Sequence, residues 1–371
     1  MSYAQATIAL ARPPPKTVLV TGANGFIGYA VSRAFVRAGW CVYGLTRRAD
    51  TVDSLLAEEI TPVIGSISAD LSFVDGLLSQ SSTRPFDVVV SCTEQLPFDE
   101  HFAHLESIFI KVAQHARQHG AAKPLVLMSS GCKDYGVTGR HGEEGLAPHT
   151  EESPLQPSDF LRSRTYCTLK VFDHADLFDA AVLRPTPLFG YGGSYYGVIL
   201  QAMHGLEGKV GKGPVKLPGH PDNIYHGCHV DDCADAYVAL ASHPVRAEVN
   251  GECFNISGYR YETVSDFLAA LAAEYKIPGG ITTTTQVSEI ESPELQALYL
   301  VFVFSQWVDS TKIRKLTGWT DKRPLFSESL PTYRLAYDAA VRAGDNGVTR
   351  IHDRITGWAS SGVTIVEPDA K

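Results

Sequence analysis

Apolar runs and amphipathic stretches alternate along the first half of the chain. Short apolar runs, of the kind found in strands covered on both faces, predict strands at residues 18–20, 40–45, 62–64, 86–90, 125–128 and 180–183. Between the fourth and fifth runs, residues 101–119 carry apolar side chains at helical spacing, and Gly120 follows as a helix stop. This alternation predicts an α/β fold with a doubly wound parallel sheet, which binds ligands beyond the carboxyl ends of its strands.

The first apolar run leads into glycines spaced G-x-x-G-x-x-G, and a helical pattern begins at Ile27. So tight a turn needs residues without a Cβ, and it aims free amide groups and a helix N-terminus at an anion. The anion that fits this strand–turn–helix context is the pyrophosphate of a dinucleotide. The predicted cofactor contacts in the turn are Gly22, Asn24, Gly25, Phe26, Ile27 and Gly28.

The second predicted strand ends in Arg47 and Arg48, where an acidic residue would bind the 2′-hydroxyl of NAD. Guanidinium groups form charge-assisted contacts with phosphate, so the pair predicts NADP(H), with Arg47 as the principal contact. The alternative is a solvated basic turn in which Asp50 and Asp53 pair with the arginines.

After residue 184 the organisation changes, and residues 190–221 are rich in glycine and proline. The chain is therefore expected to comprise a flexible tail, a dinucleotide-binding domain, a smaller mixed α/β substrate lobe and a C-terminal extension. In that order, these parts are residues 1–15, residues 16–188 with 226–258, residues 189–225 with 259–345, and residues 346–371.

Composition and charge narrow the class of protein. Of 371 residues, 44% are hydrophobic and 20% charged, as in folded globular proteins. The net charge of −9, without a Lys/Arg run, argues against nucleic-acid or membrane-surface partners, and no apolar run reaches membrane-spanning length. Seven scattered cysteines without a C-x-x-C pair indicate reduced thiols and a cytoplasmic protein. No metal site is predicted.

Tyr166 and Lys170 form a Y-x-x-x-K pair, whose spacing places both side chains on one face of a helix. A tyrosine, with a pKa of about 10, donates a proton poorly near neutral pH unless a neighbouring cation stabilises its anion. The pair lies between the fifth and sixth predicted strands of a dinucleotide fold, which favours a catalytic role. The alternative is an aromatic core residue beside a surface lysine.

Taken together, these motifs resemble extended short-chain dehydrogenases/reductases, in the superfamily of NAD(P)-dependent epimerases and dehydratases. The matching segments are residues 21–28 (T-G-x-x-G-x-x-G), 183–190 (R-P-x-x-x-[YF]-G), 229–235 (H-V-x-D-x-A-x), 254–257 and 309–319. The resemblance runs from about residue 16 to residue 320 and implies a Rossmann domain. For assembly, it implies a homodimer paired through helices that flank the sheet.

The resemblance also implies a mechanism. Hydride passes between the nicotinamide and a substrate carbon, Tyr166 moves the proton, and Lys170 lowers the tyrosine pKa and binds the ribose. A serine after the fifth strand would bind the substrate oxygen. Alignment on that strand selects Ser130 over Ser129, whereas alignment backward from the next Tyr-Gly pair puts Gly131 there and leaves no serine.

Further contacts follow from the resemblance alone. The cofactor residues it adds are Ser66, Ile67, Cys92, Lys170 and Pro185, and the substrate residues are Tyr135, Thr186, Tyr195 and Tyr225. Sugar-nucleotide enzymes of the superfamily typically hold the substrate pyrophosphate with an arginine where this chain has Tyr225, so a diphosphate would lose its bidentate partner. The segment Pro185–Thr186 looks closer to the dihydroflavonol-reductase branch of the superfamily than to its sugar-nucleotide epimerases.

These observations predict an NADP(H)-dependent oxidoreductase that reduces a carbonyl, or oxidises an alcohol, of a small non-nucleotide substrate. Two alternatives stay open because one fold hosts many functions. One is an epimerase, dehydratase, isomerase or cyclase, and the other is a non-catalytic NADP-binding regulator.

Overall fold

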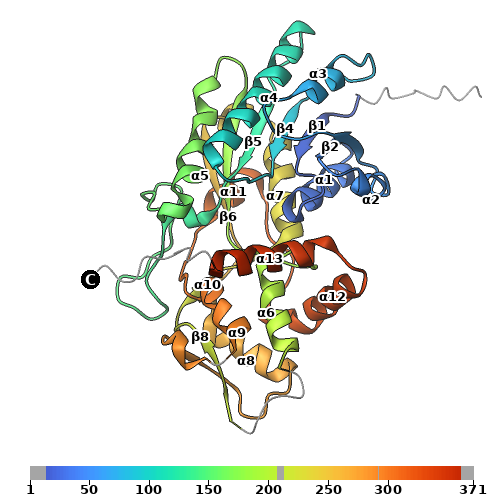
Figure 1. Ribbon diagram of the computed structural model, residues 1–371. Helices are drawn as coiled ribbons and strands as arrows, with labels where there is room; N and C mark the ends of the chain where they lie inside the picture. Colours follow the sequence, from blue (N-terminus) through green and yellow to red (C-terminus); the bar gives the residue numbers. More distant parts are fainter. Residues whose placement is uncertain (1–13, 207–212, 291, 361–371) are drawn as a thin grey trace, which may run out of the picture.

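A seven-stranded parallel sheet forms the upper part of the molecule in Figure 1, with strand order β11-β6-β5-β4-β1-β2-β3. The computed structural model describes residues 14–206, 213–290 and 292–360, so most of the predicted tail lies outside the described residues. The strands are β1 (Thr17–Thr21), β2 (Cys41–Thr46), β3 (Thr61–Ile64), β4 (Val88–Ser91), β5 (Leu125–Ser129), β6 (Asp179–Pro185) and β11 (Glu252–Ile256). This is the predicted doubly wound sheet, and its order reverses where β1 pairs with both β2 and β4.

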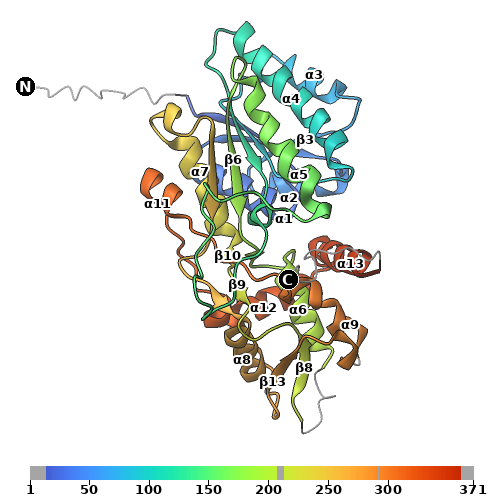
Figure 2. The ribbon, with the colours of Figure 1, turned by 90° about the vertical axis from the view of Figure 1, so that its left-hand side faces the viewer.

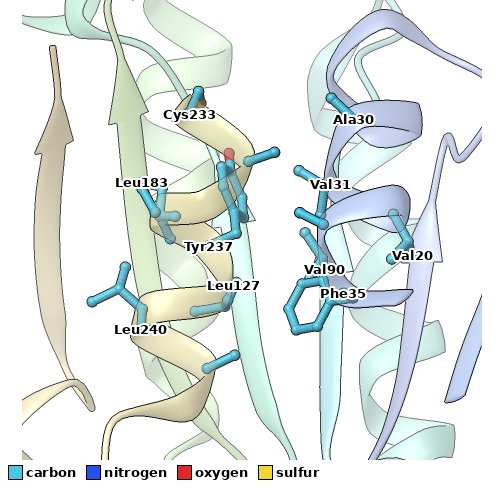
Figure 3. Packing of buried hydrophobic residues seen from close by; sticks show 14 of the residues in the cluster. Val20, Ala30, Val31, Phe35, Val90, Leu127, Leu183, Cys233, Tyr237 and Leu240 are labelled. Atoms are coloured by element: carbon cyan, nitrogen blue, oxygen red, sulfur yellow. The ribbon is translucent and has the colours of Figure 1, made fainter. Parts of the chain in front are cut away.

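Helices cover both faces of the sheet, because alternate residues of each strand point to opposite faces. On one face, α1 (Phe26–Arg37) and α7 (Val230–Ser242) pack against Val18, Val20 and Val90. Figure 3 shows Val20 and Val90 in this core. The shorter α2 (Val52–Leu56) and α11 (Thr311–Thr317) add Leu55 and Ile313 to the same core. On the opposite face, Leu19, Val89 and Val126 pack against α3 (Ser72–Leu78), α4 (Phe98–Gln118) and α5 (Asp159–Leu169).

A second apolar core lies below the carboxyl edge of the sheet (Figures 1 and 2). Its helices are α6 (Tyr195–His204), α8 (Val264–Glu274), α9 (Pro293–Ala297), α10 (Tyr299–Phe302) and α12 (Leu330–Arg342). Short strands pair as β7 (Leu188–Phe189) with β10 (Cys228–His229), β9 (Ile224–Tyr225) with β12 (Glu262–Thr263), and β8 (Val215–Pro218) with β13 (Ile281–Thr284). Stacked rings of Phe267 and Phe326, with centroids 4.7 Å apart, anchor this core.

The last described helix, α13 (Asn346–Ser360), lies between this lobe and the sheet in both views (Figures 1 and 2). Ile355 is buried in the core of the lobe, and Val348 and Ile351 pack against that core. The predicted extension of residues 346–371 therefore begins as a helix docked on the lobe, and residues 361–371 lie outside the described residues. Because α13 lies across the carboxyl edge of the sheet, it covers the place where ligands of such sheets bind.

Three further features concern membranes, disulfides and metals. No helix in the described ranges combines the length and the apolar character needed to span a bilayer. The seven cysteines are all free thiols. Within those same ranges, no group of three potential metal ligands comes together.

Candidate functional site

A cavity of about 520 Å³ opens along the carboxyl edge of the sheet, where the strand order reverses. Segments that follow β1 to β6 form its wall together with α5, α6 and α13. The predicted site residues that line it are Gly22, Asn24, Gly25, Phe26, Ile27, Arg47, Arg48, Ser66, Ile67, Cys92, Ser130, Pro185, Thr186, Tyr195 and Tyr225. The structure thus brings most of the predicted residues to one cavity, and their binding roles stay predictions.

The glycine turn is shaped by close backbone approach. Gly22 has a φ of +69°, and a Cβ there would lie 2.8 Å from the Thr93 methyl carbon. The Gly25 amide donates to the Gly22 carbonyl oxygen at 2.8 Å. Gly28 is not part of the cavity wall, contrary to the prediction. A Cβ on it would overlap the Gly22 carbonyl, so its role is to let α1 pack against the turn.

Arginine side chains gather beside the glycine turn. Arg48 pairs with Asp50 at 2.6 Å, whereas Arg47 has no hydrogen-bond or ion-pair partner within the described chain. Arg350 of α13 also lines the cavity, and its Nη2 donates to the Asn24 carbonyl oxygen at 3.3 Å. Burial lowers the pKa of Arg350, and the charges of Arg48 and Arg47 lower it further. Three guanidinium groups meet at this corner of the cavity, which is therefore suited to an anionic group.

Ser129 and Ser130, the two candidate serines at the end of β5, lie differently with respect to the cavity. Ser129 is turned away from the cavity, and its hydroxyl lies 2.7 Å from the hydroxyl of Tyr237. Ser130 lines the cavity, but its hydroxyl donates to Asp134 at 2.5 Å. Gly131 lines the cavity as well, and the Arg164 guanidinium is the group nearest to where its Cβ would lie. The cavity therefore presents a glycine opposite an arginine at this point.

The predicted Tyr166–Lys170 pair does not face the cavity. Tyr166 is 45% exposed, Lys170 is also exposed, and neither belongs to the cavity wall. The pair does share a helix face, as its spacing predicted, but α5 turns that face outward. Arg164 faces inward instead. The cavity-facing positions of α5 with this spacing are 160 and 164, which hold phenylalanine and arginine.

A buried carboxylate sets this orientation of α5. Asp134 is fully buried and forms ion pairs with Arg164 at 2.8 Å and with Arg184 at 3.2 Å. It also accepts a hydrogen bond from the Thr165 hydroxyl at 2.8 Å. Two neighbouring residues of α5 are thereby fixed to one side chain of the β5–α5 connection, so the helix cannot rotate without leaving buried charges unpaired.

Tyr135 belongs to the same buried network. Its hydroxyl donates to the side-chain oxygen of Asn255 at 2.8 Å and accepts from Arg184 at 3.0 Å. Burial raises the pKa of this phenol above its usual range. The prediction that Tyr135 contacts substrate is therefore wrong, because its ring is fully buried away from the cavity wall.

Known families and structures match this architecture. The model of the NAD dependent epimerase/dehydratase family matches residues 18–257. The chain belongs to this family. Among curated proteins, serine 3-dehydrogenase from Agrobacterium fabrum is 48% identical over 42 residues, which span 11% of this chain and only 17% of that enzyme.

Solved structures are similar in fold at low identity. A putative epimerase from Burkholderia cenocepacia is 19% identical, with a TM-score of 0.62 over 88% of this chain and 99% of that one. The dTDP-glucose 4,6-dehydratase from Bacillus anthracis, in complex with NAD, is 17% identical, with a TM-score of 0.64 over 87% of this chain and 97% of its own. These likenesses support the Rossmann-type fold of this epimerase/dehydratase family member, and the branch stays a prediction.

Sequence reasoning missed several charged residues of this family member's cavity, namely Glu94, Lys133, Arg164, Arg350 and Arg354. One signal was present for α13, since its apolar residues 348, 351 and 355 recur at helical spacing. No comparable signal marked Arg164. The sequence of α5 is mostly polar, so it does not indicate which face of the helix points inward.

The Asp134 network predicts a large stability effect. Changing Asp134→Ala leaves Arg184 buried and Arg164 partly buried without their counterion, which costs about 3–5 kcal/mol of unfolding free energy. Urea unfolding of both proteins measures the difference. In the matched control Asp159→Ala, an exposed pair with Arg162 is lost, and the expected change is under about 1 kcal/mol. Equal small losses in the two variants would contradict the account.

Proposed function

We propose that the protein is an NADP(H)-dependent oxidoreductase that reduces a carbonyl, or oxidises an alcohol, of a small non-nucleotide substrate. The observation that carries the proposal is the group of three arginines beside the glycine turn, Arg47, Arg48 and Arg350. An NAD enzyme would place an acid near the adenosine ribose, whereas guanidinium groups suit a 2′-phosphate. Only Arg48 has a carboxylate partner among these three in the described chain.

The residues of the cavity fit this cofactor. The N-terminus of α1, next to the turn at Gly22, would receive the pyrophosphate, because the first amide groups of a helix have no partner within the helix and can bind an anion. Ser66 and Ile67, at the end of β3, would contact the adenosine half. Pro185, at the end of β6, would border the nicotinamide half, because a dinucleotide lies across the switch point. When bound, the cofactor supplies or accepts the hydride.

The volume of the cavity favours a small substrate. The whole cavity has a volume of about 520 Å³, and a dinucleotide would fill much of it. Tyr225 lines the cavity where related sugar-nucleotide enzymes are expected to carry an arginine, and burial raises its pKa, so it is a neutral phenol. Both features favour a second ligand without a nucleotide.

A second function is favoured by the outward turn of Tyr166. If no group in the cavity transfers a proton to the substrate, the protein would bind NADP(H) without turnover and act as a sensor of that nucleotide. The glycine at position 131, opposite Arg164, is consistent with this alternative.

The arginine group predicts cofactor preference. Arg350→Ala removes a charge-assisted contact to the 2′-phosphate and should weaken NADPH binding about tenfold or more, with NADH binding changed less than about twofold. Isothermal titration with both nucleotides measures this. The control is Arg342→Ala, an exposed arginine at the end of α12 that is outside the cavity wall. Equal weakening of the two nucleotides would refute a 2′-phosphate contact.

The position of Tyr166 predicts an unchanged rate. If Tyr166 were the general acid, Tyr166→Phe would lower kcat by about 10²–10⁴-fold. Because the phenol lies outside the cavity, we expect kcat to stay within about twofold of the parent enzyme. The measurement is NADPH oxidation with a panel of ketones and aldehydes. A loss of two orders of magnitude would show that α5 turns inward during catalysis.

A further inference from the structure

Positive charge exceeds negative charge where β5 ends. Asp134 is one carboxylate shared between two guanidinium groups, those of Arg164 and Arg184. Lys133 lies beside them in the cavity wall and has no carboxylate partner in the described part of the chain. Glu94 is the acidic residue of that wall, and its carboxylate is 3.9 Å from Arg164, too far for a hydrogen bond.

The surroundings of Lys133 disfavour the charged form of its side chain. Its ammonium group lies 4.6 Å from the ring centroid of Phe304, a contact with an aromatic face rather than with an anion. Burial and the nearby charge of Arg164 together lower the pKa of Lys133 to about 8. A half-buried ammonium without a counterion is unfavourable, and an anionic ligand would stabilise it.

One hydrogen-bond donor of Arg164 is also unsatisfied. Its Nη2 bonds to Asp134, but its Nε is buried without a hydrogen-bond partner in the described structure. Arg164 lines the cavity, and the absence of a side chain at Gly131 leaves space beside its guanidinium. An unsatisfied buried donor of this kind is rare in folded proteins, and an acceptor that reached it would stabilise the site.

Apolar and aromatic side chains complete this half of the cavity. Leu161, Val301 and Ile355 line it together with the rings of Phe160 and Tyr225. A ligand that fits here has one acidic end and an apolar body. The Lys133 ammonium and the Arg164 guanidinium can each bond one oxygen of a carboxylate, whereas a phosphate ester would leave oxygens without donors.

We propose that the substrate is a small carboxylic acid with an apolar body, whose carboxylate binds Lys133 and Arg164. This inference rests on the proposed function, because the carbonyl to be reduced would lie between this carboxylate and the nicotinamide. Lys133 and Arg164 are then the residues that determine substrate class. They select an anion, because a neutral ketone would leave the Lys133 ammonium without a counterion.

The test is a comparison of benzoate, benzamide and phenyl phosphate as probes, titrated calorimetrically into the protein with and without saturating NADP⁺. We expect benzoate to bind about tenfold more tightly than benzamide, because charge-assisted bonds are stronger than neutral ones. It should also bind about tenfold more tightly than phenyl phosphate, some of whose oxygens would find no donor. Lys133→Met should abolish the preference, and Lys133→Arg should retain most of it. The control Lys123→Met removes an exposed lysine outside the cavity and should keep the preference.

The outcomes separate the two proposals. Equal binding of benzoate and benzamide, or tighter binding of phenyl phosphate, would overturn the carboxylate assignment even if NADP⁺ binds. Absence of NADP⁺ binding would overturn the proposed function, while the titration without cofactor still reports on the carboxylate site. Unchanged NADP⁺ affinity and thermal midpoint in Lys133→Met would show that the variant is folded, so a lost preference could be assigned to the ammonium.

Discussion

The ion pairs of Asp134 are the constraint on which the site depends. This buried carboxylate binds Arg164 from α5 and Arg184 from β6, and so joins the β5–α5 connection to both elements at the carboxyl edge of the sheet. Two positive charges on one carboxylate leave a local excess of positive charge, which extends to Lys133. The same contacts set the rotation of α5, so that Arg164 faces the cavity and Tyr166 faces solvent. The contacts of Asp134 thus account both for the local excess of positive charge and for the exclusion of the Tyr166 phenol from the cavity.

The second determinant is the closure of the cavity by α13. The whole chain carries a net charge of −9, yet the cavity corner beside the glycine turn is basic. Arg350 reaches this corner from the far end of the sequence, because α13 is anchored on the lobe through Ile355. Positive charge is therefore concentrated where an anionic cofactor would bind, and it comes from both the sheet and the lobe. Such focusing within a cleft strengthens attraction for an anion even on an acidic protein.

Much of this architecture was predictable from local pattern. The parallel strands are continuous apolar runs, and the glycine turn follows from spacing that only residues without a Cβ satisfy. The position of Arg47 at the end of β2 placed it in the cavity as well. The family followed from the order of these motifs, and the family model matches residues 18–257.

Other features were beyond local pattern for physical reasons. Helical spacing states which residues share a face, but not which face points inward. On α5 that choice is made by Asp134, about thirty residues earlier in the chain. Tyr135 was misplaced for a similar reason, since its partners Arg184 and Asn255 lie in distant strands. The contribution of α13 depends on docking between segments hundreds of residues apart.

The most direct measurement is a crystal structure of the protein with NADP⁺. The account predicts the cofactor along the carboxyl edge of the sheet, with its 2′-phosphate between Arg47 and Arg350 beneath α13. A 2′-phosphate directed into solvent, or a dinucleotide bound elsewhere, would contradict it.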